Sequence, residues 1–430
     1  MLEKYFDLSA QGTSVRTEVI AGLTTFLTMA YIMFVNPAIL STTGMDRDAV
    51  FVATCLAAAL GSLIMALVAK WPIGMAPGMG LNAFFAFTVV GALGFSWQQA
   101  LGAVFISGVI FLILTLTGIR SWLIAGIPHS MRSAVAAGIG LFLGIVALKS
   151  SGIVVANEAT FVAMGDVTET GPLLAILGFF IIAALDGLGV RGAILIGILV
   201  ITALSMALGI SQFHGVVSAP PSIAPTFLKL DIAGALHTGL VHVILVFVLV
   251  EVFDATGTLI GVAKRAGLIE EGKPNRLGKA LLADSTAIVA GSLLGTSSTT
   301  AYVESAAGVQ AGGRTGLTAL VIAVLFLASL FFSPLAADVP VYATAPALLY
   351  VACLMARELV DVEWGDITEA TPAALTAMMM PFTYSIANGL AFGFISYAAL
   401  KTLTGRPGQV HAATWLVAVL FVVRFAFFSS

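Results

Sequence analysis

Charged side chains are scarce in this 430-residue chain. Asp, Glu, Lys and Arg together make up 10% of it, whereas 59% is hydrophobic and the mean hydropathy is +1.07. A soluble domain carries about a quarter charged residues, so this composition could not keep a water-exposed surface solvated. The scarcity excludes a soluble enzyme and a secreted disulfide scaffold, and it indicates a polytopic membrane protein.

Other features are missing as well. The net charge is −3, so no cationic excess favours nucleic acid as a partner. Only two cysteines occur, Cys55 and Cys353, and their apolar surroundings are typical of small core residues. The polar stretch Met1–Glu18 lacks the pattern of a cleavable signal peptide. No G-x-x-x-x-G-K-[ST], H-E-x-x-H or G-x-S-x-G motif occurs, so we expect neither an enzyme nor a bound cofactor.

The long apolar runs predict membrane spans. A crossing takes about 20 apolar residues, fewer where a helix is broken. We predict an all-α polytopic membrane protein with a first seven-span repeat at 1–210, a connector at 211–235, a second repeat at 236–402 and a C-terminal segment at 403–430. Its apolar stretch 411–427 is expected to be an interfacial or terminal helix. The predicted spans are 19–40, 49–69, 75–91, 98–118, 133–149, 172–188 and 192–210, then 236–262, 280–296, 297–313, 315–333, 341–356, 370–384 and 386–402.

Basic residues predict the topology. Five of them lie between Lys264 and Lys279, which places this loop in the cytoplasm. Fourteen crossings then leave fifteen basic residues inside, Arg120 in a loop among them, and three outside, namely Arg47, Lys149 and Lys229. Arg424 is not assigned to a side. A miscounted crossing would destroy this asymmetry. We therefore predict a multi-pass protein of the plasma membrane (a cell inner membrane) with cytoplasmic N- and C-termini.

The two groups of spans are expected to be inverted repeats, because seven is odd. The pattern D-[VI]-T-E-x-x-P precedes the sixth span of each group, at Asp166–Pro172 and at Asp366–Pro372. A common requirement for capping a helix start is the simpler explanation. Inverted repeats are typical of transporters that work by alternating access, and a simple channel does not need them.

Two spans are poorly suited to a continuous helix. The third begins with Trp71–Gly80, which holds two prolines and three glycines, and the tenth begins with Leu294–Thr300, which is rich in Gly, Ser and Thr. Each predicts a short extended segment followed by a short helix. Interrupted spans at corresponding positions of two repeats point to a transporter's binding site. Two kinked packing helices are the alternative.

Three carboxylates fall within spans rather than loops. Glu251 and Asp254 are three residues apart and so share a helix face. Each charge costs at least about 2.5–3.5 kcal/mol at the bilayer centre. Glu304 begins the short helix of the tenth span, beside Thr299 and Thr300. No lysine or arginine is expected at this depth.

Without a nearby cation, at least one of these acids is expected to carry a proton during part of a transport cycle, which makes H+ the coupling ion. Asn82 holds the place in the third span that corresponds to Glu304 in the tenth. A neutral planar heterocycle with adjacent N–H donors would match the two oxygens of a carboxylate. The alternative is that these acids only bond neighbouring helices. Asp284 and Asp186 are placed near span ends, where interfacial solvation explains them.

Five long motifs occur in order along the chain. They are Ala21–Met29 (AGLTTFLTM), Ala76–Phe85 (APGMGLNAFF), Phe253–Leu259 (FDATGTL), Ala301–Ser305 (AYVES) and Met379–Ile386 (MMPFTYSI). Through them the chain resembles, over nearly its full length, the AzgA-like purine permeases of the nucleobase–cation symporter (nucleobase/ascorbate transporter) group. The resemblance implies a core domain from spans 1–4 and 8–11, a gate domain from spans 5–7 and 12–14, and a site built by the third, eighth and tenth spans.

The same resemblance implies roles for single residues. Asp254, Glu251 and Glu304 would couple the proton. Its binding pattern also falls on Asn82, Glu251 and Glu304 as substrate-binding residues. To these we add Thr299, Thr300 and Met79, which lie beside them in the interrupted spans, as further candidates. The implied activity is proton symport of a purine base (adenine, guanine or hypoxanthine) into the cell by alternating access.

Two other functions are weighed against this one. An anion or oxyanion carrier of the same fold would suit half-helix N-termini, but three acids at the midplane repel anions. A membrane-embedded enzyme lacks a visible nucleophile–base pair or metal-ligand cluster. The expected partners are the purine substrate and the lipid bilayer, and a homodimer is left open.

Overall fold

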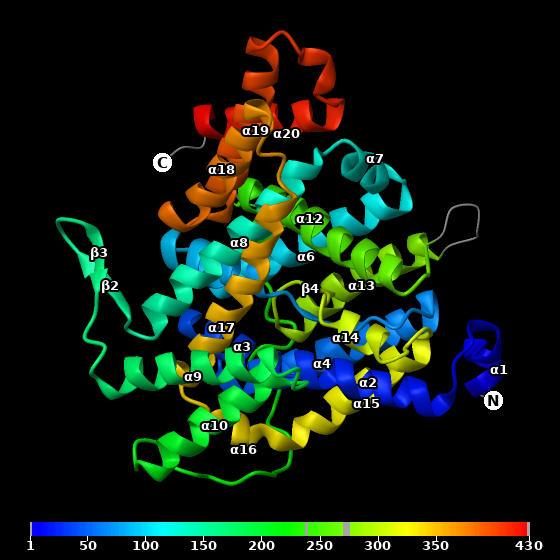
Figure 1. Cartoon of the computed structure of the whole chain (residues 1–430), viewed down its shortest axis with the longest axis vertical. Coiled ribbons are helices and arrows are strands. Elements are labelled where there is room, and N and C mark those ends of the chain that lie inside the picture. The colour runs from blue at the N-terminus through cyan, green and yellow to red at the C-terminus, as the bar shows by residue number, and fades with distance from the viewer. Residues whose placement is uncertain (1, 237–239, 270–275, 428–430) are drawn as a thin grey trace.

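The computed structural model describes residues 2–236, 240–269 and 276–427. Within these ranges, the description leaves out the side chains of Leu2, Ser121, Phe253, Asp254, Thr256 and Phe427. Figure 1 shows a bundle of helices with two short strand pairs. The sequence predicts this all-α architecture, because the long apolar runs leave helices as the way to satisfy the backbone within lipid.

The first repeat forms its elements where the hydropathy places them. Two of its spans are interrupted, the first between two helices and the third after a strand. The seven spans are α2 (Val15–Met29) with α3 (Ile32–Leu40), α4 (Arg47–Ile64) with the π-helix η3 (Met65–Ala69), β1 (Met75–Pro77) with α5 (Met79–Ala83) and the π-helix η4 (Phe84–Ala92), α6 (Trp97–Leu116), α8 (His129–Ser150), α9 (Thr170–Gly187) and α10 (Ala193–Ala207).

The second repeat follows the same order. Its spans are α12 (Val241–Arg265), α13 (Leu277–Leu294), β4 (Thr299–Ala301) with α14 (Ser305–Gln310), α15 (Gly316–Ser329), α17 (Val341–Ala356), α18 (Ile367–Phe382) and α19 (Ile386–Leu403). In the described residues, ten helices or helix pairs are long and apolar enough to cross a membrane. With α10, α18 and the two strand-containing spans, they account for the fourteen predicted crossings.

Shorter elements connect the spans. They are α1 (Leu2–Phe6), η1 (Ser9–Gln11), η2 (Ser41–Thr43), α7 (Ile119–Ala125), the hairpin β2 (Val154–Asn157) and β3 (Phe161–Met164), α11 (Ile232–Ala235), η5 (Leu330–Phe332), α16 (Ser333–Asp338), η6 (Arg357–Asp361) and η7 (Pro407–Gln409). A last helix, α20 (Ala412–Phe427), covers the apolar stretch that fits neither repeat.

The spans pack in two sets. In one, α13 lies against α4 and α6, and α15 lies against α2 and α4; in the other, α8 lies against α17 and α18, and α18 against α19. Small residues allow the close crossings. A Cβ on Gly140 of α8 would lie 2.5 Å from Met355 Cβ of α17, so this crossing depends on glycine.

The repeated D-[VI]-T-E motif makes the same turn in each half. The backbone N–H of Thr168 donates to Asp166 Oδ1 at 2.9 Å, and Thr368 donates to Asp366 Oδ1 at 2.9 Å. Asp366 is the N-cap of α18, whereas α9 begins four residues after Asp166. The shared turn fits both an internal repeat and a common capping requirement.

Helix α20 packs along α19. Near its start, Thr414 Oγ1 donates to the Gly126 carbonyl at 2.7 Å, and near its end Arg424 Nη2 donates to Asn388 Oδ1 at 3.3 Å. Asn388 is in the first turn of α19, while Lys401 near the other end of α19 pairs with Glu369 at 2.9 Å. α20 therefore runs antiparallel to α19 and is the last described helix, which agrees with the expectation of a terminal helix rather than an interfacial one.

This course separates the two ends of the chain. α1 lies beside the start of the third span, where Lys70 Nζ donates to the Tyr5 carbonyl. Thr88, near the far end of that span, donates to the carbonyl of Tyr384, just before α19. The described C-terminal end, which reaches the first turn of α19, is therefore opposite α1 in the bundle (Figure 1).

Candidate functional site

The two interrupted spans meet as a pair of antiparallel strands. Met75 pairs with Ala301, Ala76 with Thr300, and Pro77 with Thr299. Hydrogen bonds extend the pairing at both ends, from Gly78 N to Ser298 O at 2.9 Å and from Tyr302 N to Gly74 O at 3.0 Å. Backbone N–H and C=O groups that are buried at membrane depth need hydrogen-bond partners. Here the extended segment of each repeat supplies these partners for the extended segment of the other repeat. The prediction of an extended segment leading into a short helix is confirmed in both spans.

Glu251 lies where α12, α6 and the entry to β4 meet. Its side chain is fully buried. Oε1 accepts hydrogen bonds from Ser298 Oγ at 3.0 Å and from Ser107 Oγ at 3.2 Å. Among the described residues, Oε2 has no hydrogen-bond partner. One oxygen of this carboxylate is thus held by the protein, and the other can receive a proton or a ligand's N–H group.

Asn82 is bound to the residue next to Ser298. Its Oδ1 accepts from Ser297 Oγ, and its buried Nδ2 has no partner in the described part of the chain. The hydroxyl of Thr299, also fully buried, has none there either. Consecutive serines before β4 therefore connect Asn82 of the third span with Glu251 of the eighth. Beside them are a carboxylate acceptor, an amide donor and a hydroxyl without protein partners.

Glu304 stands at the start of α14, three residues after β4. Its side chain is half-buried, and Oε1 accepts from the Tyr31 hydroxyl at 2.6 Å. Tyr31 occupies the break between α2 and α3, so the first span also contributes to this region. Nothing in the spacing of Tyr31 signals that contact, because it joins residues 273 positions apart.

The other predicted site residues are Met79, Thr300 and Asp254. Met79 is buried at the first position of α5. The hydroxyl of Thr300 donates to Asp284 Oδ1 at 3.2 Å, so it is engaged within the protein. Asp254 belongs to α12 one turn beyond Glu251, and its side chain lies outside the described residues.

Two charged residues were predicted in the wrong environment. Arg120 was assigned to a cytoplasmic loop and Asp284 to a span end, but both are fully buried, and Arg120 Nη2 lies 3.1 Å from Asp284 Oδ2. The guanidinium also lies 4.0 Å from the Phe111 ring centroid and donates to the Leu281 carbonyl at 3.1 Å. The expectation of no arginine at this depth is therefore wrong.

The chain geometry explains this placement. Gly118 adopts a left-handed conformation (φ +77°) just after α6 and turns the chain back, so that α7 packs against α6 and α12. Arg120 then points into the bundle, and Asp284 lies two turns inside α13. A turn-forming glycine two residues before the arginine is the one local signal of this reversal. Because Asp284 neutralises Arg120, the pair adds no net positive charge and does not favour an anion carrier.

Comparison with known proteins supports the fold and the family. Residues 16–392 match the model of the permease family. The adenine permease AdeP of Escherichia coli is 52% identical over 99% of this chain and 96% of its own length. The guanine/hypoxanthine permease PbuG of Bacillus subtilis is 45% identical over 99% of this chain and 100% of its own.

A solved structure shares the architecture. The transmembrane domain of the cyanobacterium bicarbonate transporter BicA aligns with a TM-score of 0.66 at 17% identity, covering 87% of this chain and 97% of that domain. The likeness confirms the predicted polytopic fold. The relatives include both adenine and guanine/hypoxanthine permeases, so they establish the family without selecting the AzgA-like subgroup. This chain belongs to the permease family, which makes it a multi-pass membrane transporter and not an enzyme.

Proposed function

We propose that this protein imports purine nucleobases (adenine, guanine or hypoxanthine) by proton symport, as an AzgA-like permease. Relatives named as adenine and guanine/hypoxanthine permeases match it over nearly its whole length. The observation that carries the proposal is that two polar atoms of the site, Glu251 Oε2 and Asn82 Nδ2, are left for a ligand to bind. Each is buried and without a partner in the described chain, and both are linked to neighbouring serines. A purine edge offers a donor for the first and an acceptor for the second.

The proton would be carried by the buried carboxylates. Glu251 is held by two serine hydroxyls and forms no salt bridge in the described structure, so binding a proton there removes an uncompensated charge. Glu304, bonded to Tyr31, and Asp254 are the further candidates. Asp284 is excluded from this role in our proposal, because Arg120 already compensates its charge.

Alternating access would move the two packed sets of helices against each other. We propose that spans 1–4 and 8–11 form the core domain, which carries the paired strands and Glu251, and that spans 5–7 and 12–14 form the gate. From the basic loops we infer that α1 is on the cytoplasmic side of the plasma membrane. The described end of α20 would then be on the outer side, which differs from the cytoplasmic C-terminus that the sequence predicts.

Uptake of radiolabelled purine by cells that lack their own purine transport tests the proposal. We expect uptake that an uncoupler abolishes and that adenine, guanine or hypoxanthine outcompetes, whereas uracil does not. Uptake that ignores the proton gradient would contradict the coupling. Measuring competition at two pH values separates substrate choice from proton dependence.

Variants locate the site. Glu251→Gln and Glu304→Gln should lose uptake while reaching the membrane in normal amounts. Glu158→Gln, which changes an exposed glutamate between β2 and β3, is the matched control and should transport normally. Full uptake by Glu304→Gln would remove Glu304 from the site.

A further inference from the structure

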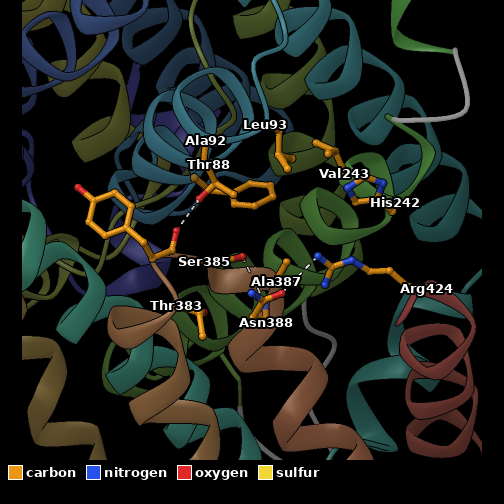
Figure 2. Close-up of a pocket in the computed structure, with 12 residues that line it drawn as sticks. Thr88, Ala92, Leu93, His242, Val243, Thr383, Ser385, Ala387, Asn388 and Arg424 are labelled. Carbon is orange, nitrogen blue, oxygen red and sulfur yellow. Dashed lines mark hydrogen bonds between the residues drawn. The ribbon is translucent and has the colours of Figure 1, made fainter. Parts of the chain in front are cut away.

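A cavity of about 180 Å³ lies away from Glu251 and Glu304, neither of which lines it. Four elements meet there: the end of η4, the start of α12, the turn between α18 and α19, and the last turns of α20. Figure 2 shows Arg424 directed at Asn388, with His242 on the same side of the cavity and Thr88 and Ser385 across it. The volume has room for a small polar ligand or several water molecules.

Two nitrogen atoms among these side chains are unsatisfied. Arg424 Nη2 donates to Asn388 Oδ1 at 3.3 Å, but Nη1 is buried and has no partner among the described residues. His242 Nδ1 is also buried and without a partner there. Leaving a buried polar group unpaired is unfavourable, and more so for a charged one. A ligand with several acceptor oxygens would accept hydrogen bonds from both nitrogens. His242 Nδ1 can donate such a bond when it carries a hydrogen atom.

The charge of the lining selects an anion. Among the described lining residues, Arg424 is the one that is permanently charged, and none is an aspartate or glutamate. The hydroxyls of Thr88, Ser385 and Thr383 add polar groups around it. A guanidinium with a fork of N–H donors is the side chain best matched to phosphate oxygens.

The cavity lies where several apolar helices begin or end. η4 ends at Ala92, α12 begins at Val241, α18 ends at Phe382 and α19 begins at Ile386, so the polar residues lie at one end of the bundle. An arginine near the end of an apolar helix is typically found at the membrane interface. The wall also combines η4 and α12 of the proposed core domain with α18 and α19 of the proposed gate, so one ligand would touch both domains.

We propose that this cavity binds a phosphate-type oxyanion, supplied by an anionic lipid headgroup or by free phosphate, with Arg424 as its main ligand. Asn388 positions the guanidinium, and His242 contributes a further donor. This site is separate from the proposed purine site and does not depend on which substrate is transported.

Thermal unfolding of the purified full-length protein tests the site. Inorganic phosphate is titrated from zero to 10 mM, on the order of its physiological range, with gluconate keeping the ionic strength constant. In parallel, nanodiscs of phosphatidylcholine are compared with nanodiscs that contain phosphatidylglycerol. Phosphate stabilises proteins in general, so the measured quantity is the difference in midpoint shift between variants.

Arg424→Gln should lose the midpoint shift, whereas Arg424→Lys should keep part of it because the positive charge remains. Arg16→Gln removes an exposed arginine of α2 and should behave like the wild type. A saturating shift with inorganic phosphate identifies a free anion as ligand, and a shift only with phosphatidylglycerol identifies a lipid.

Equal shifts in all variants, or no shift in either experiment, would overturn the proposal. If Arg424→Gln does not fold, the midpoint shifts of the wild-type protein still test the proposal. Its response must saturate with phosphate or depend on phosphatidylglycerol, since a purely linear phosphate response with no lipid effect would show that no site exists.

Discussion

The buried salt bridge between Arg120 and Asp284 should be strongly coupled. At the observed 3.1 Å between Nη2 and Oδ2, two unit charges in an effective dielectric of about 20 attract by about 5 kcal/mol. Removing one partner leaves the other charge buried and unpaired, at a cost of about 3–5 kcal/mol. We therefore expect Arg120→Gln and Asp284→Asn each to lower the free energy of unfolding by that amount.

The double variant separates the interaction energy of the Arg120–Asp284 pair from the cost of burying a single charge. With both changes made, two neutral amides face each other and no charge is left unpaired. The combined loss should therefore fall short of the sum of the single losses by about 3 kcal/mol, the upper range for residues in direct contact. Equilibrium unfolding in mixed micelles with increasing dodecyl sulfate, followed by circular dichroism, measures each free energy.

An exposed ion pair in the same chain serves as the control. Arg406 Nη1 lies 3.0 Å from Asp366 Oδ2, at nearly the same separation, but Arg406 is 48% exposed. Its coupling should stay below about 1 kcal/mol. If the Arg120–Asp284 cycle gives a coupling no larger than that of the Arg406–Asp366 cycle, the reasoning from burial is refuted.

Three further predictions rest on single contacts. Glu18→Gln should cost about 1–3 kcal/mol in the same unfolding assay, because its carboxylate accepts from the backbone N–H groups of Arg314 and Thr318 and from the Thr318 hydroxyl; unchanged stability would contradict this. Gly22→Leu should reduce the folded fraction on size-exclusion chromatography, since a Cβ there would lie 2.6 Å from Val321 Cβ. Hydrogen bonds from the Thr368 backbone and hydroxyl hold the pKa of Asp366 below its ordinary value. The resulting stability is complete above a pH of about 4 and is lost as the pH falls through the lowered pKa, so thermal midpoints of wild type and Asp366→Asn should converge at acid pH.

Patterns within one stretch of sequence predicted the spans and the two interruptions. Apolar runs specify crossings because the bilayer admits few alternatives, and the prolines and glycines of Trp71–Gly80 cannot form a regular helix. Glu251 and Asn82 could be selected because polar side chains at membrane depth need a reason to be there. The structure brings these two to neighbouring serines, which the separate spans alone did not show.

Contacts between distant segments escaped prediction. Arg120 and Asp284 are 164 positions apart, so neither residue's own surroundings reveal the other. The count of basic residues placed Arg120 in a cytoplasmic loop. Such a count uses only positions in the sequence, so it cannot detect that the chain turns back after α6 and returns the Arg120 side chain to the interior. The direction of α20 was missed for a similar reason: its one basic residue, Arg424, gives no asymmetry between its ends.

The alternation of side chains over Ser297–Thr300, which leads into β4, explains why the tenth span is broken at this point. Ser298 and Thr300 are two residues apart and reach Glu251 and Asp284, while Ser297 reaches Asn82 of the other repeat. Extended backbone directs residues two apart to one face and the intervening residues to the opposite face. A helix over the same residues would rotate each by about 100° and separate these contacts. Ser297, Ser298 and Thr300 thus join two acidic residues on neighbouring helices to an amide of the opposite repeat. A ligand or proton that changes the bonds of Glu251 also acts on Ser298, whose carbonyl accepts from Gly78 next to the strand pair that both repeats share.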